Sequence, residues 1–316
     1  MFSPRVWLPV VAAIVLASST AVYAAYADNG TESSGISVPK GVTASYVLYD
    51  RESDSVTSQL NPTKQYRSAS LVKLLIALDY LQTKGSLDAV PATDRAALQS
   101  MLRSSDDVAA RNFWQAAGRD QVITRMVPRL GLRQTQPPAD PNYWGYTALS
   151  ASDVVKIYRY LLDDNDPQGF KAFVLAQLHQ STRCAVDGRD QSFGIPSAVP
   201  TPVGVKQGWS GFGETPAGQE CSPTTLAEKA AYGKEAPDSV SLRSAQRKGA
   251  PNIDLTSPLL HTSGLVDGDS KILVVLTLYP ANTSWDTAAG QITDLTRQVY
   301  ESGSGRTSRD PGDVNP

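Results

Sequence analysis

The chain has 316 residues, which is enough for one large folded domain or two small ones. Its 29 basic and 31 acidic residues are spread along the sequence without a basic block, which argues against a nucleic-acid partner. Hydrophobic residues make up 41% of the chain and charged residues 19%, a composition that excludes a wholly disordered protein and a multi-span membrane protein.

The first 27 residues have the pattern of an export segment. A single arginine, Arg5, precedes a run without charge from Val6 to Ala27 that ends in small residues. We expect a secretory signal peptide at 1–27; the alternative is an uncleaved N-terminal anchor, because this run is long enough to tether the protein to a membrane through residues 6–27. Either case predicts an extracellular or cell-envelope location. A lipid anchor there is not expected, because no cysteine lies near the end of the run.

Residues 28–42 are polar and rich in Gly and Ser, so we expect a flexible tether. The folded domain is predicted at 43–302, and residues 303–316 are predicted to form a disordered tail. The only two cysteines, Cys184 and Cys221, are expected to form one disulfide, since an exported protein favours oxidised cysteines.

The N-terminal part of the domain predicts a hairpin and then a buried helix. β-favouring runs at Ala44–Tyr49 and Ser55–Leu60 flank a polar turn. The segment from Ser70 to Thr83 has apolar residues on most sides, which is typical of a helix inside the core.

The middle of the chain is predicted to be helical and its C-terminal part to return to strands. Apolar periodicity indicates helices over Thr93–Leu132, from a cap at Ser152 to Leu162, and after Pro167; residues 133–146 interrupt it with prolines and aromatic residues. Strands are predicted at Val203–Val205, Leu259–Val266 and Lys271–Tyr279, and a final helix at Trp285–Tyr300. Residues 213–253 lack periodicity apart from a helical hint at Leu226–Tyr232 and look like an insertion.

This order of elements predicts an α+β fold. Strands come first, then a helical block, then strands and a helix, which favours an antiparallel sheet formed from both chain ends and flanked by helices. An all-helical lobe, roughly residues 86–195, would be inserted into it.

The first motif that can carry chemistry is Ser70-Leu71-Val72-Lys73, at the start of the buried helix. A spacing of three residues places the hydroxyl and the ammonium on one helix face, where a desolvated lysine can take the proton of a serine nucleophile. The motif is weak alone, because Ser37-Val38-Pro39-Lys40 also matches it. The alternative is an ordinary helix serine beside a lysine that reaches the surface.

Two further motifs follow. Ser105-Asp106-Asp107 precedes a helix, where it could equally be a helix cap with acids in the first turn. Lys206-Gln207-Gly208, followed by Trp209, lies on a predicted strand and by itself is only a basic residue near a turn.

In this order the three motifs resemble the S-x-x-K, S-D-N and K-T-G signatures of class A β-lactamases and penicillin-binding proteins. The surrounding stretches RSASLVKLLIALDYL, MLRSSDDVAARNFW and VGVKQGWSGFG also look like that superfamily, and the resemblance spans Thr43 to Tyr300 apart from the insertion. It implies a β-lactamase-like fold, with the site between the sheet and the helical lobe. A monomer without a cofactor would act on a β-lactam or a peptidoglycan-peptide-like small substrate.

The resemblance also implies roles for single residues. Ser70 would attack the carbonyl carbon, Lys73 would help remove its proton, and Ser105 would pass a proton to the leaving nitrogen. Substrate or oxyanion contacts would come from Asp107, Lys206, Gln207, Gly208 and Trp209. Among these, Lys206 would attract an anionic group, the backbone N–H of Trp209 would help to bind the oxyanion, and Gln207 would replace a threonine as a substrate contact.

Two departures weaken the expected hydrolytic cycle. Asp107 stands where the signature has asparagine, and a salt bridge to Lys73 would hold the lysine charged and weaken it as a base. No glutamate occurs between Glu52 and Glu214, and Asp140 is the only acid in residues 133–146, where class A β-lactamases carry the glutamate that activates water. We therefore expect slow deacylation.

Other chemistries find less support. His179 and His261 lie in no recognisable Ser-His-Asp setting, and no zinc spacing, phosphate loop or nucleotide fingerprint occurs. The rival to an enzyme is a non-catalytic binding protein that retains the fold. A Cys184–Cys221 bridge would hold the insertion near the site, where it would restrict substrate size.

Overall fold

The computed structural model describes residues 35–200, 203–222 and 251–303. The expected export segment at 1–27, most of the tether, the helical hint at 226–232 and the C-terminal tail after residue 303 lie outside the described residues.

A five-stranded antiparallel sheet in the order β2-β1-β7-β6-β5 forms the centre of the molecule. Its strands are β1 (Thr43–Asp50), β2 (Ser55–Leu60), β5 (Gly204–Ser210), β6 (Leu259–Val266) and β7 (Lys271–Leu278). β1 pairs with β7 along its full length, from Thr43 opposite Leu278 to Asp50 opposite Lys271. The two ends of the domain therefore meet in one sheet, which confirms the predicted α+β fold.

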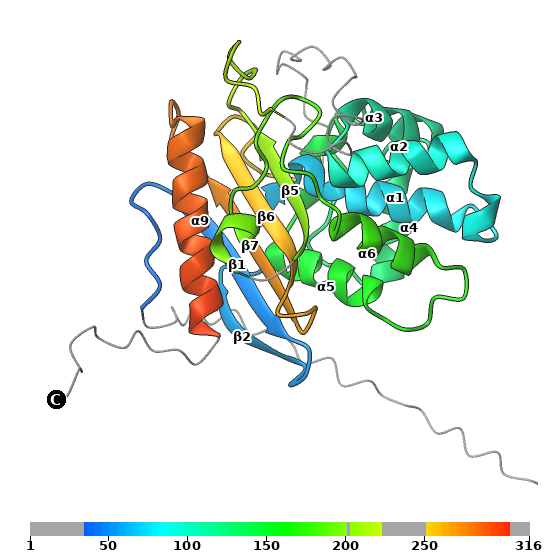
Figure 1. Cartoon of the computed structure of the whole chain (residues 1–316), viewed down its shortest axis with the longest axis horizontal. Helices are drawn as coiled ribbons and strands as arrows, with labels where there is room; N and C mark the ends of the chain where they lie inside the picture. Colours follow the sequence, from blue (N-terminus) through cyan, green and yellow to red (C-terminus); the bar gives the residue numbers. More distant parts are fainter. Residues whose placement is uncertain (1–34, 201–202, 223–250, 304–316) are drawn as a thin grey trace, which may run out of the picture.

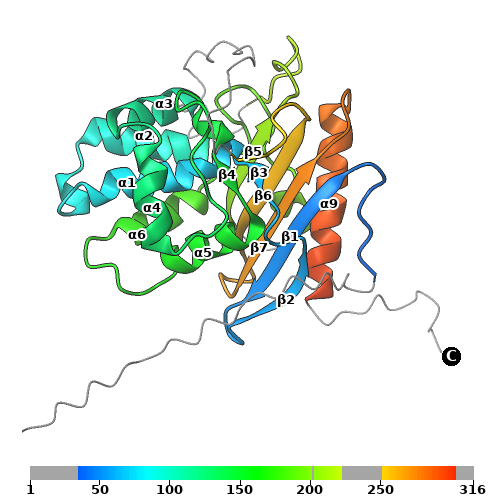
Figure 2. The ribbon, with the colours of Figure 1, turned by 180° about the vertical axis from the view of Figure 1, so that it is seen from behind.

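Helices cover both faces of this sheet, as Figure 1 and, from behind, Figure 2 show. One face carries α9 (Trp285–Ser302) and the short α7 (Ile195–Ala198). The lobe on the other side contains α1 (Lys73–Gln82), α2 (Ala92–Arg103), α3 (Asp107–Ala116), α4 (Gln121–Leu130), α5 (Ala151–Leu161) and α6 (Phe170–Leu178), with the 3-10 turns η1 (Ala69–Val72), η2 (Leu87–Ala89) and η3 (Trp144–Tyr146). The lobe thus begins with α1, before the expected boundary near residue 86.

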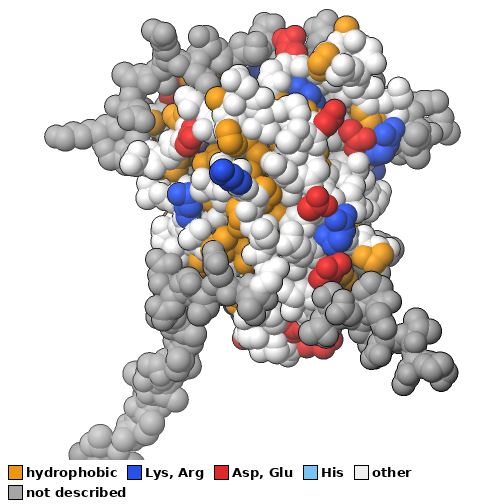
Figure 3. All heavy atoms as spheres, turned by 90° about the vertical axis from the view of Figure 1, so that its left-hand side faces the viewer, with side chains coloured by type: hydrophobic (Ala, Val, Ile, Leu, Met, Phe, Trp, Pro, Cys, Tyr) orange, Lys and Arg blue, Asp and Glu red, His pale blue; other side chains and the backbone are white. Residues whose placement is uncertain are grey.

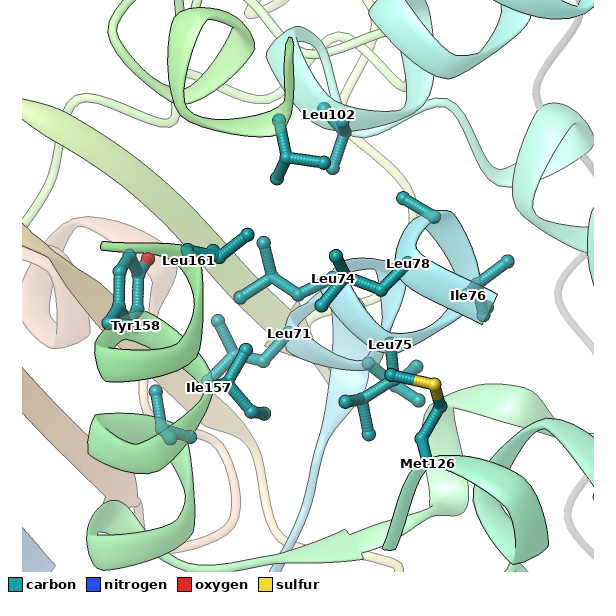
Figure 4. Close-up of a cluster of buried hydrophobic side chains, with 14 of the residues drawn as sticks. Leu71, Leu74, Leu75, Ile76, Leu78, Leu102, Met126, Ile157, Tyr158 and Leu161 are labelled. Atoms are coloured by element: carbon teal, nitrogen blue, oxygen red, sulfur yellow. The ribbon is translucent and has the colours of Figure 1, made fainter. Parts of the chain in front are cut away.

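The core of the lobe is built around α1, as the apolar run from Ser70 predicted. Every residue from Lys73 to Asp79 is buried, and the close-up in Figure 4 shows leucines of η1 and α1 meeting side chains of α2, α4 and α5. Each such leucine contributes roughly 1.5–3 kcal/mol when fully buried. This packing makes α1 a fixed support for the residues at its N-terminal end.

A second core lies between the sheet and α9. Ala288, Ile292, Leu295 and Val299 recur at helical spacing on α9 and are buried against the strands. On the face that carries α9, acidic and basic side chains are interspersed, and apolar side chains gather near its middle (Figure 3).

Some local expectations were wrong in detail. The cap of α5 is Ser150, not Ser152, because Ser150 has the extended backbone of a cap and its hydroxyl accepts a hydrogen bond from the N–H of Asp153. β5 extends to Ser210, and the lobe is not all-helical, since β3 (Tyr66–Arg67) pairs with β4 (Ala148–Leu149). Strands of two residues are too short to show an alternating pattern, so the sequence did not predict them.

None of the helices in the described ranges is long and apolar enough to span a bilayer.

Candidate active site

Ser70 lies on the tight turn η1, directly before α1. In a 3-10 turn, residues i and i+3 are nearly eclipsed, so Lys73 lies beneath Ser70, and the lysine Nζ is 3.0 Å from the serine Oγ. Ala69, just before Ser70, has a φ of +44°, a left-handed backbone that is strained for a residue other than glycine. Such strain persists only where the surroundings enforce it, and it often marks a functional site.

The Lys73 ammonium is fully buried and surrounded by oxygens. It lies 2.6 Å from the carbonyl and 3.2 Å from the hydroxyl of Ser105, and 2.5 Å from Oδ1 of Asp107. The Asp107 side chain is 39% exposed, while that of Lys73 is 0% exposed. The salt bridge expected from the sequence is therefore present, and Lys73 acts as a donor in this arrangement.

The second motif reaches the site through a sharp turn before α3. Asp106 caps α3 by accepting a hydrogen bond from the N–H of Ala109, so the capping role falls to the middle residue of the motif. Ser105 has a φ of +58° and turns its carbonyl and hydroxyl toward Lys73. The cap and the site residues are thus supplied by different positions of one tripeptide.

Lys206 reaches the same hydroxyl from the sheet. Its Nζ donates to Oγ of Ser105 at 2.9 Å, and its side chain is buried. Burial lowers the pKa of Lys206 well below its usual range; the charge of Lys73 lowers it further, whereas Asp107 and Asp187 act in the opposite direction. Ser105 therefore lies between two lysines that come from two parts of the fold.

Gly208 allows the edge strand β5 to approach Ser70 closely. A Cβ atom on Gly208 would lie 3.2 Å from the Ser68 carbonyl oxygen and 3.4 Å from the backbone nitrogen of Ser70. The backbone at Trp209, the next residue, is thereby held near the start of η1. Its indole points elsewhere and packs edge-on against Phe193 and Trp285.

Gln207 does not point the way Lys206 does. Successive side chains of a strand lie on opposite faces, and the amide nitrogen of Gln207 donates to the carbonyls of Gln191 at 3.2 Å and Phe193 at 2.5 Å. Its Oε1 is buried and has no hydrogen-bond partner among the described residues. Gln207 thus holds the adjoining loop against the strand.

Trp144 is a site residue that the sequence reasoning missed. The loop at 133–146 folds over Ser70, and η3 presents the Trp144 ring to Lys73, with 4.9 Å between the ammonium and the ring centroid. Asp140, the only acid of this loop, instead accepts hydrogen bonds from the backbone and side chain of Asn142. An aromatic ring, not a carboxylate, therefore faces Lys73 from this loop.

Asp187 is a second residue that no motif signalled. One carboxylate oxygen accepts a hydrogen bond from the Trp209 indole at 2.8 Å, and the other accepts one from the backbone N–H of Arg189 at 3.1 Å. Burial raises the pKa of Asp187, and the charge of Asp107 adds to this rise. The carboxylate therefore lies at the end of the strand that carries Lys206.

The two histidines lie outside this cluster. His179 Nε2 lies 3.0 Å from Oδ2 of Asp269, at hydrogen-bond distance. His261 is buried on β6, where its Nε2 contacts the Arg67 carbonyl at 3.0 Å, and burial lowers its pKa to about 4. Neither contacts Ser70, so no Ser-His-Asp arrangement forms. Within the described ranges, no group of three or more potential metal ligands comes together.

Cys184 and Cys221 form the disulfide predicted from the sequence. The bridge joins the loop that carries Asp187 to the segment after β5, and the N–H of Cys221 donates to the carbonyl of Gly188 at 2.8 Å. The guanidinium of Arg189 adds hydrogen bonds to the carbonyls of three residues of that segment, Phe212, Gly213 and Glu214. The start of the predicted insertion is thus fastened beside the site.

Comparisons with known proteins agree with this geometry at the level of the fold. No protein-family model matches the chain. It is 41% identical over 174 residues to proteins named "Putative lipoprotein LppW" in Mycobacterium tuberculosis and Mycobacterium bovis. The match covers 54% of this chain and 54% of each relative, so the chain spans about half the length of the curated relatives it matches.

Solved structures cover more of the chain. PBP-A matches with a TM-score of 0.57 at 11% identity, over 85% of this chain and 92% of that one. A class A β-lactamase from Mycobacterium abscessus matches with a TM-score of 0.55 at 16% identity, over 84% of this chain and 95% of that one. The chain therefore has the β-lactamase and penicillin-binding-protein fold, as its three motifs predicted.

Proposed function

We propose that this protein is an exported serine acyl-transfer enzyme that acts on β-lactams or cell-wall peptide amides and forms a long-lived acyl-enzyme at Ser70. The observation that carries the proposal is a continuous chain of contacts. Ser70 Oγ, Lys73 Nζ, Ser105 Oγ and Lys206 Nζ follow one another at 3.0, 3.2 and 2.9 Å. This chain can deliver a proton from the attacking hydroxyl to a leaving group.

The proposed reaction uses each of these groups once. The Ser70 oxygen forms a bond to the carbonyl carbon as its proton passes to a neutral Lys73, and the backbone N–H groups of Ser70 and Trp209 stabilise the oxyanion. The carbon–nitrogen bond then breaks while Ser105 gives its proton to the nitrogen and recovers one from a neighbouring lysine. Lys73 must lose a proton before it can accept one, and its ion pair with Asp107 opposes that step.

Slow deacylation follows from the loop at 133–146. Hydrolysis of the ester needs a base that activates water, and in this loop Trp144 faces Lys73 while Asp140 is engaged by Asn142. A point mutant of PBP-A has been solved as an acyl-enzyme complex with penicillin G, which supports such chemistry on this fold. Rapid turnover of a β-lactam by the purified domain would contradict slow deacylation.

The name of the mycobacterial relatives supports a location at the cell envelope. The two cysteines of this chain are bonded to each other, so we place its attachment, where it has one, in the apolar run at 6–27.

The test is covalent labelling with a fluorescent penicillin, followed by intact mass measurement. The wild type and Ser152→Ala, a buried serine outside the site, should each gain the mass of one acyl group, and Ser70→Ala should gain none. An adduct that persists in Ser70→Ala, or none in the wild type, would overturn the proposal.

The rival function is a binding protein that keeps the fold without catalysis. This alternative is favoured by the contacts of the Lys73 ammonium, which donates to Asp107 and to both oxygens of Ser105 and so is poorly placed to accept a proton from Ser70. Reversible binding of the penicillin without an adduct would select this alternative.

A further inference from the structure

The two residues of β5 that were expected to bind an anionic group of the substrate, Lys206 and Gln207, are both engaged within the protein. Lys206 was expected to attract such a group, but its ammonium is buried against Ser105 Oγ and the Gln207 carbonyl. Gln207 was expected to contact the substrate, but its amide N–H groups are taken by two backbone carbonyls. Gln207 therefore presents no free donor to an incoming carboxylate, and the buried Lys206 ammonium already donates to two acceptors.

A carboxylate lies at the same end of β5. Asp187 is held by the Trp209 indole and by a backbone N–H, and Trp209 follows Gly208, the residue that meets the backbone of Ser70. The Asp187 carboxylate interacts electrostatically with Lys73 and Asp107 of the site and with Lys206. Its position is therefore close enough to act on a charge that is bound beside β5.

No cation neutralises Asp187 by direct contact among the described residues. Arg189 is the basic residue nearest along the chain, but its guanidinium donates to the carbonyls of the 212–214 segment and stacks over Trp285. Arg183 of the same loop pairs with Asp190. The Asp187 carboxylate thus has no ion-pair partner among the described residues, and the charges of Arg189, Lys73 and Lys206 act on it without direct contact.

The leaving group is the part of the substrate that would lie nearest to Asp187. Ser105 is the proposed proton donor to the leaving group, and Lys206 of β5 contacts its hydroxyl. A substituent on the leaving group would thus lie beside Lys206, whose charge interacts with that of Asp187.

We propose that Asp187 is a specificity-determining residue that selects acyl donors with a cationic leaving group and disfavours those with a carboxylate there. This inference rests on the proposed function of Ser70. A positive group gains from the Asp187 carboxylate, which has no direct ion-pair partner among the described residues, whereas a carboxylate is repelled by it and finds no free donor on Gln207.

The test uses three thioesters that share the hippuryl acyl group. Their leaving groups are thiocholine, which is cationic, methyl thioglycolate, which is neutral, and thioglycolate, which is anionic. The rate of Ser70 acylation is followed by intact mass. We expect the wild type to prefer the cationic over the anionic ester by about tenfold or more, and Asp187→Asn to lose most of that preference, measured as the ratio of the two rates within each variant.

Asp294→Asn on the exposed side of α9 is the control, because it removes the same charge far from β5 and should keep the preference. An anionic preference in the wild type, or an unchanged ratio in Asp187→Asn, would overturn the inference. The wild-type ratio remains decisive even where Asp187→Asn does not fold.

Failure of the proposed function gives a different result. If the penicillin leaves no adduct and none of the three esters acylates Ser70, that function fails, and the charge preference is then read from binding of the same esters to Ser70→Ala by tryptophan fluorescence. Because the Trp209 indole donates to Asp187, binding at this carboxylate should change the signal. Equal affinity for the cationic and anionic esters would then refute the inference on its own.

Discussion

The Lys73 ammonium has more hydrogen-bond acceptors around it than it has protons. Its shortest contacts are to Oδ1 of Asp107 at 2.5 Å and to the carbonyl of Ser105 at 2.6 Å, while Ser70 Oγ is 3.0 Å away. An ammonium held in this way donates to Ser70 and does not accept its proton. The single exchange of asparagine for aspartate in the second motif can therefore decide how fast Ser70 reacts.

Asp107→Asn should accelerate acylation of Ser70 by roughly tenfold, because an amide oxygen still accepts a hydrogen bond from Lys73 but no longer stabilises its charge. The measurement is the second-order rate of labelling by a fluorescent penicillin. The control is Asp294→Asn, which should label at the wild-type rate. An unchanged rate in Asp107→Asn would mean that the ion pair does not limit the proton transfer.

At the scale of elements, one buried carboxylate fixes the loop that covers the site. Asp153 on α5 accepts hydrogen bonds from the backbone N–H groups of Arg133 and Gln134 and from the hydroxyl of Thr135, and it pairs with Lys156. These bonds set where the loop leaves α4, and hence where η3 presents Trp144.

Asp153→Ala should reduce the free energy of unfolding by at least about 2 kcal/mol, because it leaves several buried donors unsatisfied. Urea unfolding of the variant measures the loss. The exposed Asp294→Ala, which breaks an ion pair on the surface of α9, should change stability by less than about 0.5 kcal/mol. The acyl-enzyme should also hydrolyse at a different rate, since the loop is no longer held over Ser70. Equal stability of the two variants would show that Asp153 does not anchor the loop.

The elements that the sequence predicted well are those with a regular local pattern. β6 was predicted with its bounds, and β7 and α9 to within one or two residues, because β7 is a continuous run of β-favouring apolar residues and α9 has an apolar period of 3.6. Trp144 and Asp187 were missed because they lie on loops, whose positions are set by Asp153 and by the disulfide rather than by any period.

Gln207 shows a different limit. The motif suggested a substrate contact, yet strand alternation alone turns it away from Lys206, and this could have been inferred from the predicted strand. The buried Oε1 of Gln207, which has no hydrogen-bond partner among the described residues, is a different case. Its environment is set by the loop at 191–193, and no pattern in the sequence predicts it.

At the scale of the whole molecule, the site lies at the boundary between the helical lobe and the five-stranded sheet. Ser70, Lys73 and Ser105 come from the helical lobe, whereas Lys206, Gly208 and Trp209 come from the edge strand of a sheet that both chain ends complete. Away from these polar contacts, the lobe packs on the sheet through apolar side chains of one shared core, which includes Val47, Leu265 and Val274 of the strands. The shared core fixes the two parts against each other, and the loops at the edge of the site adjust its local geometry.

The Cys184–Cys221 disulfide links two of the loops at the edge of the site covalently. It closes a sequence separation of 37 residues and holds the loop of Asp187 to the segment that begins the insertion. In the chain-entropy model a bridge over such a loop stabilises the fold by roughly 3–4 kcal/mol. Because β5 lies inside the closed loop, the constraint acts on the strand that carries Lys206 as well.

We expect the double variant Cys184→Ser/Cys221→Ser to unfold at lower urea concentration, with a loss of roughly 3 kcal/mol, and to lose part of the charge preference assigned to Asp187. Reduction of the wild type with dithiothreitol should reproduce both effects, whereas the same treatment should leave the double variant unchanged. A double variant as stable as the wild type would mean that the loop is held by Arg189 and its three carbonyl partners without the bridge. In that case the triple variant with Arg189→Ala should lose further stability, because the three guanidinium hydrogen bonds are then gone, while those from the Cys221 N–H to the Gly188 carbonyl and from the Thr215 hydroxyl to the Asp187 carbonyl remain.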